Sequence, residues 1–221
     1  MTHSRSRVAA HRWWRTWGAA LAATLVALAA AAPAHAAPAR SPCLAATART
    51  EAALGIPPQL LSAIALAESG RWDRARKENI AWPWTIFAEG RATYAPNKAR
   101  AVAEVERLRA SGVRNIDVGC MQVNLRYHPD AFGTLDEAFD PAANVAYAAG
   151  FLKRLKSATR SWSRTIGFYH SRRPEHSRPY RLRVQRLWIA ERRRAALERR
   201  AERAEYYRQR KAAIARVRAR L

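Results

Sequence analysis

The stretch from Tyr180 to Leu221 contains neither proline nor glycine and is rich in Arg, Ala and Glu. Good helix formers dominate it and helix breakers are absent, so it predicts one long helix with a solvated face. Residues 178–221 carry 16 basic and four acidic residues, whereas residues 37–177 carry 20 basic and 13 acidic ones. The formal net charge of +23 is therefore concentrated in a C-terminal tail, and it says little about what the central part binds.

The first 36 residues are typical of a secretory signal peptide. The opening residues are basic and contain no acid, residues 18–32 are apolar, and a small-x-small cleavage pattern ends at Ala36. The alternative is an uncleaved membrane anchor, but the apolar run is shorter than the roughly 20 residues that a spanning helix needs. We therefore expect a periplasmic protein with two parts, a domain over residues 37–177 and a tail over residues 178–221.

A glutamate stands on the apolar face of the first predicted helix. This helix is expected to have a Pro-Pro pair in its first turn, to continue with QLLSAIALAES and to end at Gly70 as its C-terminal cap. Leu60, Ile64 and Glu68 are spaced four residues apart, so Glu68 projects from the apolar face near the helix end. Burial there raises the pKa of the carboxyl group, which lets Glu68 hold a proton near neutral pH. The alternative is a frayed last turn with Glu68 in solvent.

The middle of the domain mixes strands with a helix. Residues 79–95 place β-branched and aromatic residues around a Glu-Gly turn, which predicts a hairpin. Residues 97–110 predict an amphipathic helix. Residues 113–125 are apolar around a central glycine and predict an extended stretch or loop, in which Gln122 and Asn124 point the same way.

Two more helices complete the predicted domain. One begins near Pro141 and has a buried face, and a short one contains Tyr169. Two prolines then break the pattern before the tail. The predicted fold class is α+β, mainly α-helical, with a short β-hairpin and a basic C-terminal helix.

Four motifs lie in order across residues 43–180: ALAESG, GCMQVN, NVAYAAGFL and FYHS. In order and spacing the chain resembles lytic transglycosylases of the soluble-lytic, lysozyme-like superfamily. The resemblance implies a lysozyme-like fold and peptidoglycan glycan strands as the substrate. WPWT with AEGR, and IDVGCMQVN with YHP, are most similar to members associated with bacterial secretion, conjugation or flagellar systems. An envelope-spanning complex of that kind is thus an expected partner.

The resemblance also implies roles for particular residues. Glu68 matches the catalytic acid/base, and Tyr169 matches a tyrosine that lies beside this glutamate across the cleft, where it could hold the proton of Glu68 in place. Cys120 and His170 depart from the family, which more often has a larger apolar residue and an asparagine there. The residues implied to bind substrate are Ser69, Met121, Gln122, Asn124, Asn144, Tyr147 and Tyr169.

The chemistry implied by the resemblance needs only one carboxyl group. The 2-acetamido group of the substrate can stabilise the oxocarbenium-like centre and its C6 hydroxyl can act as nucleophile, so Glu68 can serve as acid and then as base. Cleavage of the β-1,4 bond between N-acetylmuramic acid and N-acetylglucosamine would leave a 1,6-anhydro-muramyl end. The alternative on the same fold is a hydrolytic muramidase, for which the candidate second carboxylates are Asp73, Glu78, Glu89 and Asp117.

Cys43 and Cys120 either form one disulfide, as an oxidising compartment permits, or remain two buried thiols. The histidines show no ligand spacing near them, so we expect no metal, and the chemistry requires no cofactor. Some tryptophans are candidates to stack on sugar rings unless they belong to the core. These are Trp72, Trp82, Trp84 and Trp162.

The basic tail has several candidate partners. It could bind nucleic acid in an assembly protein, but export would place it away from most nucleic acid, so we expect none. An anionic membrane surface, acidic peptide stems of the wall and a secretion-system component remain, as does a solvated helix that only adds solubility. A further alternative is a wall-binding scaffold with this fold and no activity. We expect the chain to be a monomer.

Overall fold

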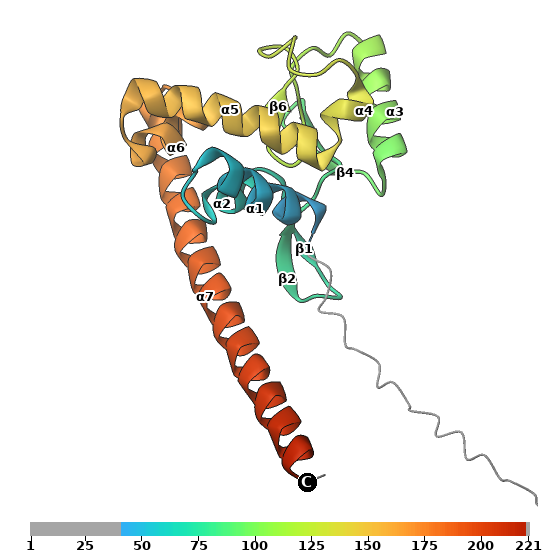
Figure 1. The fold of residues 1–221 in the computed structure, drawn as a ribbon. Coiled ribbons are helices and arrows are strands. Elements are labelled where there is room, and N and C mark those ends of the chain that lie inside the picture. The colour runs from blue at the N-terminus through green and yellow to red at the C-terminus, as the bar shows by residue number, and fades with distance from the viewer. Residues whose placement is uncertain (1–40, 220–221) are drawn as a thin grey trace, which may run out of the picture. The chain divides into compact units, whose positions relative to one another are not determined.

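The computed structural model describes residues 41–219, and the expected signal peptide over residues 1–36 lies outside this range. The described chain is mainly helical with short antiparallel strands (Figure 1), which confirms the α+β class. Its helices are α1 (Pro42–Leu54), α2 (Leu60–Ser69), α3 (Lys98–Ala110), α4 (Leu135–Ala138), α5 (Pro141–Thr159), α6 (Trp162–His170) and α7 (Pro174–Arg218). Its strands are β1 (Gly70–Asp73), β2 (Glu78–Ala81), β3 (Thr85–Ala88), β4 (Arg91–Tyr94), β5 (Ile116–Val118) and β6 (Val123–Asn124).

Helix α2 lies at the centre of the larger core, where Leu60 and Ile64 are fully buried. Gln59 caps it with a φ of 64°, so the Pro-Pro pair precedes the helix instead of forming its first turn. Gly70 is extended and begins β1, so it is not the left-handed cap that we expected. A Cβ atom on Gly70 would lie 2.3 Å from the carbonyl oxygen of Leu66, and this close approach is what requires glycine.

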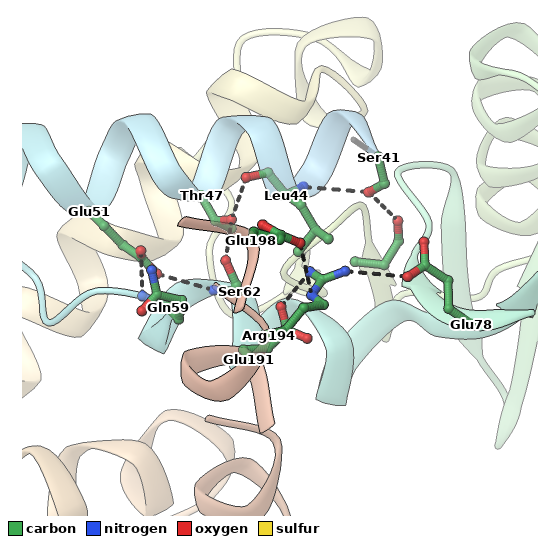
Figure 2. Close-up of polar contacts among 11 residues, drawn as sticks. Ser41, Leu44, Thr47, Glu51, Gln59, Ser62, Glu78, Glu191, Arg194 and Glu198 are labelled. Carbon is green, nitrogen blue, oxygen red and sulfur yellow. Dashed lines mark hydrogen bonds and ion pairs between the residues drawn. The ribbon is translucent and has the colours of Figure 1, made fainter. Parts of the chain in front are cut away.

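A carboxylate of α1 caps the start of α2. Glu51 accepts hydrogen bonds from the backbone N–H groups of Gln59 at 2.7 Å and Ser62 at 3.3 Å (Figure 2). It also accepts one from the N–H of Leu61 at 2.7 Å. Such N–H groups have no partner within a helix, and negative charge at a helix N-terminus is favourable. Burial nevertheless raises the pKa of Glu51. This single buried side chain therefore fixes where α2 begins.

The strands form two small antiparallel sheets. β3 and β4 pair as the expected hairpin around the Glu89–Gly90 turn, and β5 and β6 extend it in the order β4-β3-β5-β6. β1 and β2 form a second hairpin, pairing Gly70 with Ala81. We did not predict this hairpin, because residues 79–81 were assigned to the other one.

Residues 113–125 contain β5, a turn and β6 rather than one extended stretch. Gly119 in the turn has a φ of 83°, and a Cβ atom there would lie 2.3 Å from the Asn144 side chain, so only glycine fits. Gln122 also has a positive φ. It therefore belongs to the turn, and Gln122 and Asn124 do not alternate along one strand as expected.

The remaining helices of the domain begin where their capping residues predict. Asn97, Asp140 and Ser161 each accept a hydrogen bond from a backbone N–H three residues later, at the starts of α3, α5 and α6. Pro141 follows its cap directly, in the first turn, where a helix loses no hydrogen bond to proline. The predicted helices over 97–110, from Pro141 and around Tyr169 are confirmed.

Helix α7 begins at Pro174, earlier than the start expected near Tyr180, and it contains Pro179. A proline inside a helix removes a backbone hydrogen bond, and burial of Tyr180 and Val184 against the core offsets this cost. α7 packs on α2 and α6 (Figure 1). It therefore passes without interruption through the domain boundary expected at residue 178.

Arg194 ties the middle of α7 to β2. Its guanidinium pairs with Glu78 of β2 at 3.3 Å and with Glu191 of its own helix at 2.6 Å (Figure 2). Beyond this point every residue over 199–219 is exposed, and this part of α7 extends past the other labelled elements (Figure 1). The first half of α7 is thus part of the packed structure, and the last turns are not.

Cys43 and Cys120 form a disulfide that joins α1 to the turn after β5. The expected pairing is confirmed, and the alternative of two free thiols is wrong. Among the described helices, none is long and apolar enough to cross a membrane.

Candidate active site

A cavity of about 490 Å³ opens at the end of α2. Its lining comes from α2, β3, β5, the turn that follows β5, β6 and the segment after it, α5, α6 and α7. Five of the site residues predicted from the sequence line it together: Glu68, Gln122, Asn124, Tyr147 and Tyr169.

Glu68 lies in the last full turn of α2 and faces this cavity. Its Oε1 accepts a hydrogen bond of 2.5 Å from the hydroxyl of Tyr180. Burial raises the pKa of Glu68 from 4.5 to about 7, and Asp117 also raises it, while the Tyr180 bond and Arg183 lower it. This is the environment of a carboxyl group that can give up and take back a proton near neutral pH.

Tyr180 is a site residue that we did not predict. It is 7% exposed, and its ring stacks on His170 with ring centroids 4.5 Å apart and an interplanar angle of 6°. We had assigned it to the solvated tail. The signal was nevertheless present, because Tyr180, Val184 and Leu187 follow the helical spacing of a buried stripe, and all three pack in the larger core.

His170, which departs from the family pattern, lies against this tyrosine. Burial lowers the pKa of His170, which favours a neutral ring at neutral pH. A flat, neutral imidazole restricts the ring of Tyr180 and adds no charge next to Glu68. In this structure His170 therefore contacts Tyr180, which is itself a site residue.

Tyr169 differs from our expectation that it would hold the proton of Glu68. Its hydroxyl donates a hydrogen bond of 2.8 Å to the backbone carbonyl of Met121. Burial raises its pKa well above the usual 10, so the hydroxyl stays protonated and remains a donor. Tyr169 lines the cavity beside Glu68, but Tyr180 makes the bond to the carboxyl group.

Ser69, Met121 and Asn144 are corrections to the predicted set of substrate contacts, because each is fully buried. The Ser69 hydroxyl donates to the carbonyl of Cys120 at 2.8 Å. Asn144 accepts from the Met121 N–H at 2.9 Å and donates to the carbonyl of Val118 at 3.0 Å. These side chains hold the turn after β5 in place beneath the cavity, and they cannot themselves reach a glycan.

The two amides in the cavity differ in what they can offer a ligand. Asn124 donates to Asn115 and Asp117, each at 2.7 Å, and accepts from two backbone N–H groups, so its hydrogen-bonding capacity is used. Gln122 donates to two backbone carbonyls through Nε2. Its Oε1 has no partner among the described residues and is free to accept. Tyr147, in turn, is hydrogen bonded to His128 at 2.9 Å.

Only one of the four candidate second carboxylates lines the cavity, and this is Asp117 of β5. Burial raises its pKa, and the bond from Asn124 lowers it. Asp73 accepts hydrogen bonds from the turn after β1, and Glu78 pairs with Arg194. Tertiary packing thus selects Asp117, which lies 49 positions from Glu68 in the sequence.

None of the four candidate tryptophans is part of the cavity lining. Trp72 is 62% exposed on β1, and Trp162 packs against the larger core. The aromatic surface of the cavity comes instead from Phe87, Tyr127, Tyr147, Phe151 and Tyr169. No cluster of three or more His, Cys, Asp or Glu side chains suited to a metal ion occurs within residues 41–219.

Comparison with known families identifies the domain. The transglycosylase SLT domain matches residues 46–182, which is more than half of the chain. Searches of curated proteins and of solved structures gave no match. The matched range contains Glu68, the cavity and Tyr180, and its end lies in α7. The chain therefore belongs to the transglycosylase SLT domain family, as a lytic transglycosylase-type enzyme with a lysozyme-like fold that acts on peptidoglycan.

Proposed function

We propose that the enzyme cleaves the β-1,4 bond between N-acetylmuramic acid and N-acetylglucosamine with Glu68 as its general acid and base. The observation that carries this proposal is the buried Glu68 carboxyl group, with a pKa of about 7, facing the cavity under the Tyr180 hydroxyl. A carboxyl group that titrates near neutral pH serves both roles well.

The reaction has two proton transfers. Protonated Glu68 gives its proton to the glycosidic oxygen as the bond to C1 of the muramyl residue breaks, and the 2-acetamido group stabilises the positive charge at C1. The ionised Glu68 then takes the proton of the C6 hydroxyl while the C6 oxygen of the same muramyl residue bonds to C1. The product is a 1,6-anhydro-muramyl end, and no water is consumed.

Tyr180 is a positioning residue in this scheme. Its hydroxyl donates to Glu68 Oε1, which holds one carboxyl oxygen and stabilises the ionised form. Gln122 offers a free acceptor oxygen suited to a sugar hydroxyl or an acetamido N–H. An uncharged amide suits an uncharged glycan.

A hydrolytic muramidase is the second candidate, and the placement of Asp117 favours it. Asp117 shares the cavity with Glu68, and its carboxyl group is close enough to raise the pKa of Glu68. An ionised Asp117 could position a water molecule for attack on C1. Its product would be a reducing sugar in place of an anhydro end.

Mass spectrometry of muropeptides released from purified peptidoglycan tests both candidates. We expect products one water lighter than reducing muropeptides, no release by Glu68→Gln, and anhydro products still formed by Asp117→Asn. Reducing products that disappear with Asp117→Asn would establish the hydrolase. Release by Glu68→Gln at the wild-type rate would refute the role of Glu68, whichever product forms.

We also propose that residues 1–36 direct export to the periplasm. The Cys43–Cys120 disulfide supports this, because disulfides persist in oxidising compartments. N-terminal sequencing of the protein from the cell envelope should begin at Ala37, and an intact Met1 would contradict cleavage. Association with an envelope-spanning secretion or flagellar complex stays a prediction of the sequence motifs.

A further inference from the structure

The proposed reaction gives no role to the exposed last turns of α7. Every residue over 199–219 is exposed, including Tyr206 (58%), Tyr207 (64%), Ile214 (47%) and Val217 (61%). A helix of this length spans about 30 Å. Apart from a contact between the rings of Tyr206 and Tyr207, these four large side chains pack against no other part of the described chain.

These residues are divided between two sides of the helix. At about 100° per residue, the four large apolar or aromatic side chains fall within an arc of about 140° together with six of the eight cations of the segment. The opposite side carries all the alanines, both glutamates, Gln209 and the remaining two cations. We call the first side the basic face; it consists of Arg199, Arg200, Arg203, Tyr206, Tyr207, Arg210, Lys211, Ile214, Val217 and Arg218.

The cations of the basic face are free to meet a ligand. Within the described residues, none of the six makes a hydrogen bond or an ion pair. On the opposite side, Glu205 pairs with Arg208 and accepts from Gln209 at 3.0 Å, and Arg216 makes no hydrogen bond or ion pair within the described residues. The same arrangement disfavours a second copy of the chain as the occupant, since two such faces would bring twelve like charges together.

We propose that the basic face of α7 docks on the surface of an anionic phospholipid bilayer. Charge complementarity supplies attraction, and tyrosine is a residue that settles at the level of lipid headgroups. Confinement to one side of a straight helix fits a flat surface, and it directs Glu205 away from that surface. A flexible polyanion could wrap around the helix, so it would not require the cations to lie on one side.

Docking would hold the catalytic cavity near the membrane. The same helix contributes Tyr180 to the site, and its Arg194 pairs with Glu78 of β2. The docking segment and the residue that contacts Glu68 therefore belong to one continuous helix. This inference goes beyond the proposed function and does not depend on which product forms.

Two double variants with the same change in charge test the proposal. Arg203→Gln/Arg210→Gln removes two cations from the basic face, and Arg208→Gln/Arg216→Gln removes two from the opposite side. Binding of the chain from Ala37 onward, which is the form that the proposed export leaves, is measured by sedimentation with phosphatidylcholine vesicles, with and without phosphatidylglycerol. We expect binding to require phosphatidylglycerol and to fall about 25-fold in the first variant, from roughly fivefold per cation, with little change in the second.

Amide hydrogen exchange shows which segment of the chain meets the vesicle. Exchange in peptides from residues 199–219 should slow when phosphatidylglycerol vesicles are added. Equal losses in both variants, or no slowing in these peptides, would refute a docking face. Loss of sedimentation with purified peptidoglycan, but not with vesicles, in the Arg203→Gln/Arg210→Gln variant would assign the face to the wall instead. Glycan cleavage measured in parallel separates this outcome from failure of the proposed function.

Discussion

Replacing Glu68 with Gln should stabilise the folded chain at neutral and alkaline pH while it abolishes cleavage. The pKa of Glu68 is about 7 in the folded protein, above its ordinary 4.5. The folded chain therefore binds this proton more tightly than the unfolded chain does, so its contribution to stability is complete below pH 4.5 and is lost as the pH rises through 7. The two pKa values correspond to about 3 kcal/mol. Glutamine is neutral, has the same shape and can still accept from Tyr180, so it avoids this loss.

Urea unfolding followed by tryptophan fluorescence, at several pH values from 4 to 9, measures the effect. The unfolding free energies of the two proteins should agree near pH 4, and the Gln variant should be more stable by about 3 kcal/mol at pH 8. Titration of groups that do not interact with Glu68 is common to both proteins and cancels in the difference. A difference that stays constant with pH would show that Glu68 is not held in a desolvated site, and the argument for its protonation would fail.

Three further variants test the surroundings of the site. Tyr180→Phe keeps the ring stack but removes the bond that stabilises ionised Glu68, so the alkaline limb of kcat/KM should move up by about one pH unit; an unmoved limb would contradict the contact. Glu51→Ala leaves buried N–H groups at the start of α2 without an acceptor and should cost about 3 kcal/mol in urea unfolding, whereas a loss below 1 kcal/mol would mean that water replaces the carboxylate. Cys43→Ala/Cys120→Ala opens a loop with a sequence separation of 77 and should lower the unfolding free energy by about 4 kcal/mol; equal stability under reducing and oxidising conditions would show that the disulfide does not act.

Much of the local structure was predictable, because its causes are local. The four-residue spacing that ends in Glu68 defined α2 and the side of the helix on which the carboxyl group lies. Asn97 and Asp140 are helix caps whose partners lie three residues away, so α3 and α5 begin where the sequence indicates. The Glu89–Gly90 turn likewise predicted the β3–β4 hairpin.

The site itself depended on contacts between distant parts of the chain. Tyr180 lies 112 positions from Glu68, and only the packing of α7 on α2 brings its hydroxyl to the carboxyl group. Packing also places only Asp117, of the four candidate second carboxylates, in the cavity lining. It buries Ser69, which the family resemblance implied would bind substrate. Sequence spacing determines which side of a helix or strand a residue occupies, because backbone geometry is local. Which side chains then meet, and how far each pKa moves, depends on burial by segments far along the chain, and the tertiary structure alone decides this.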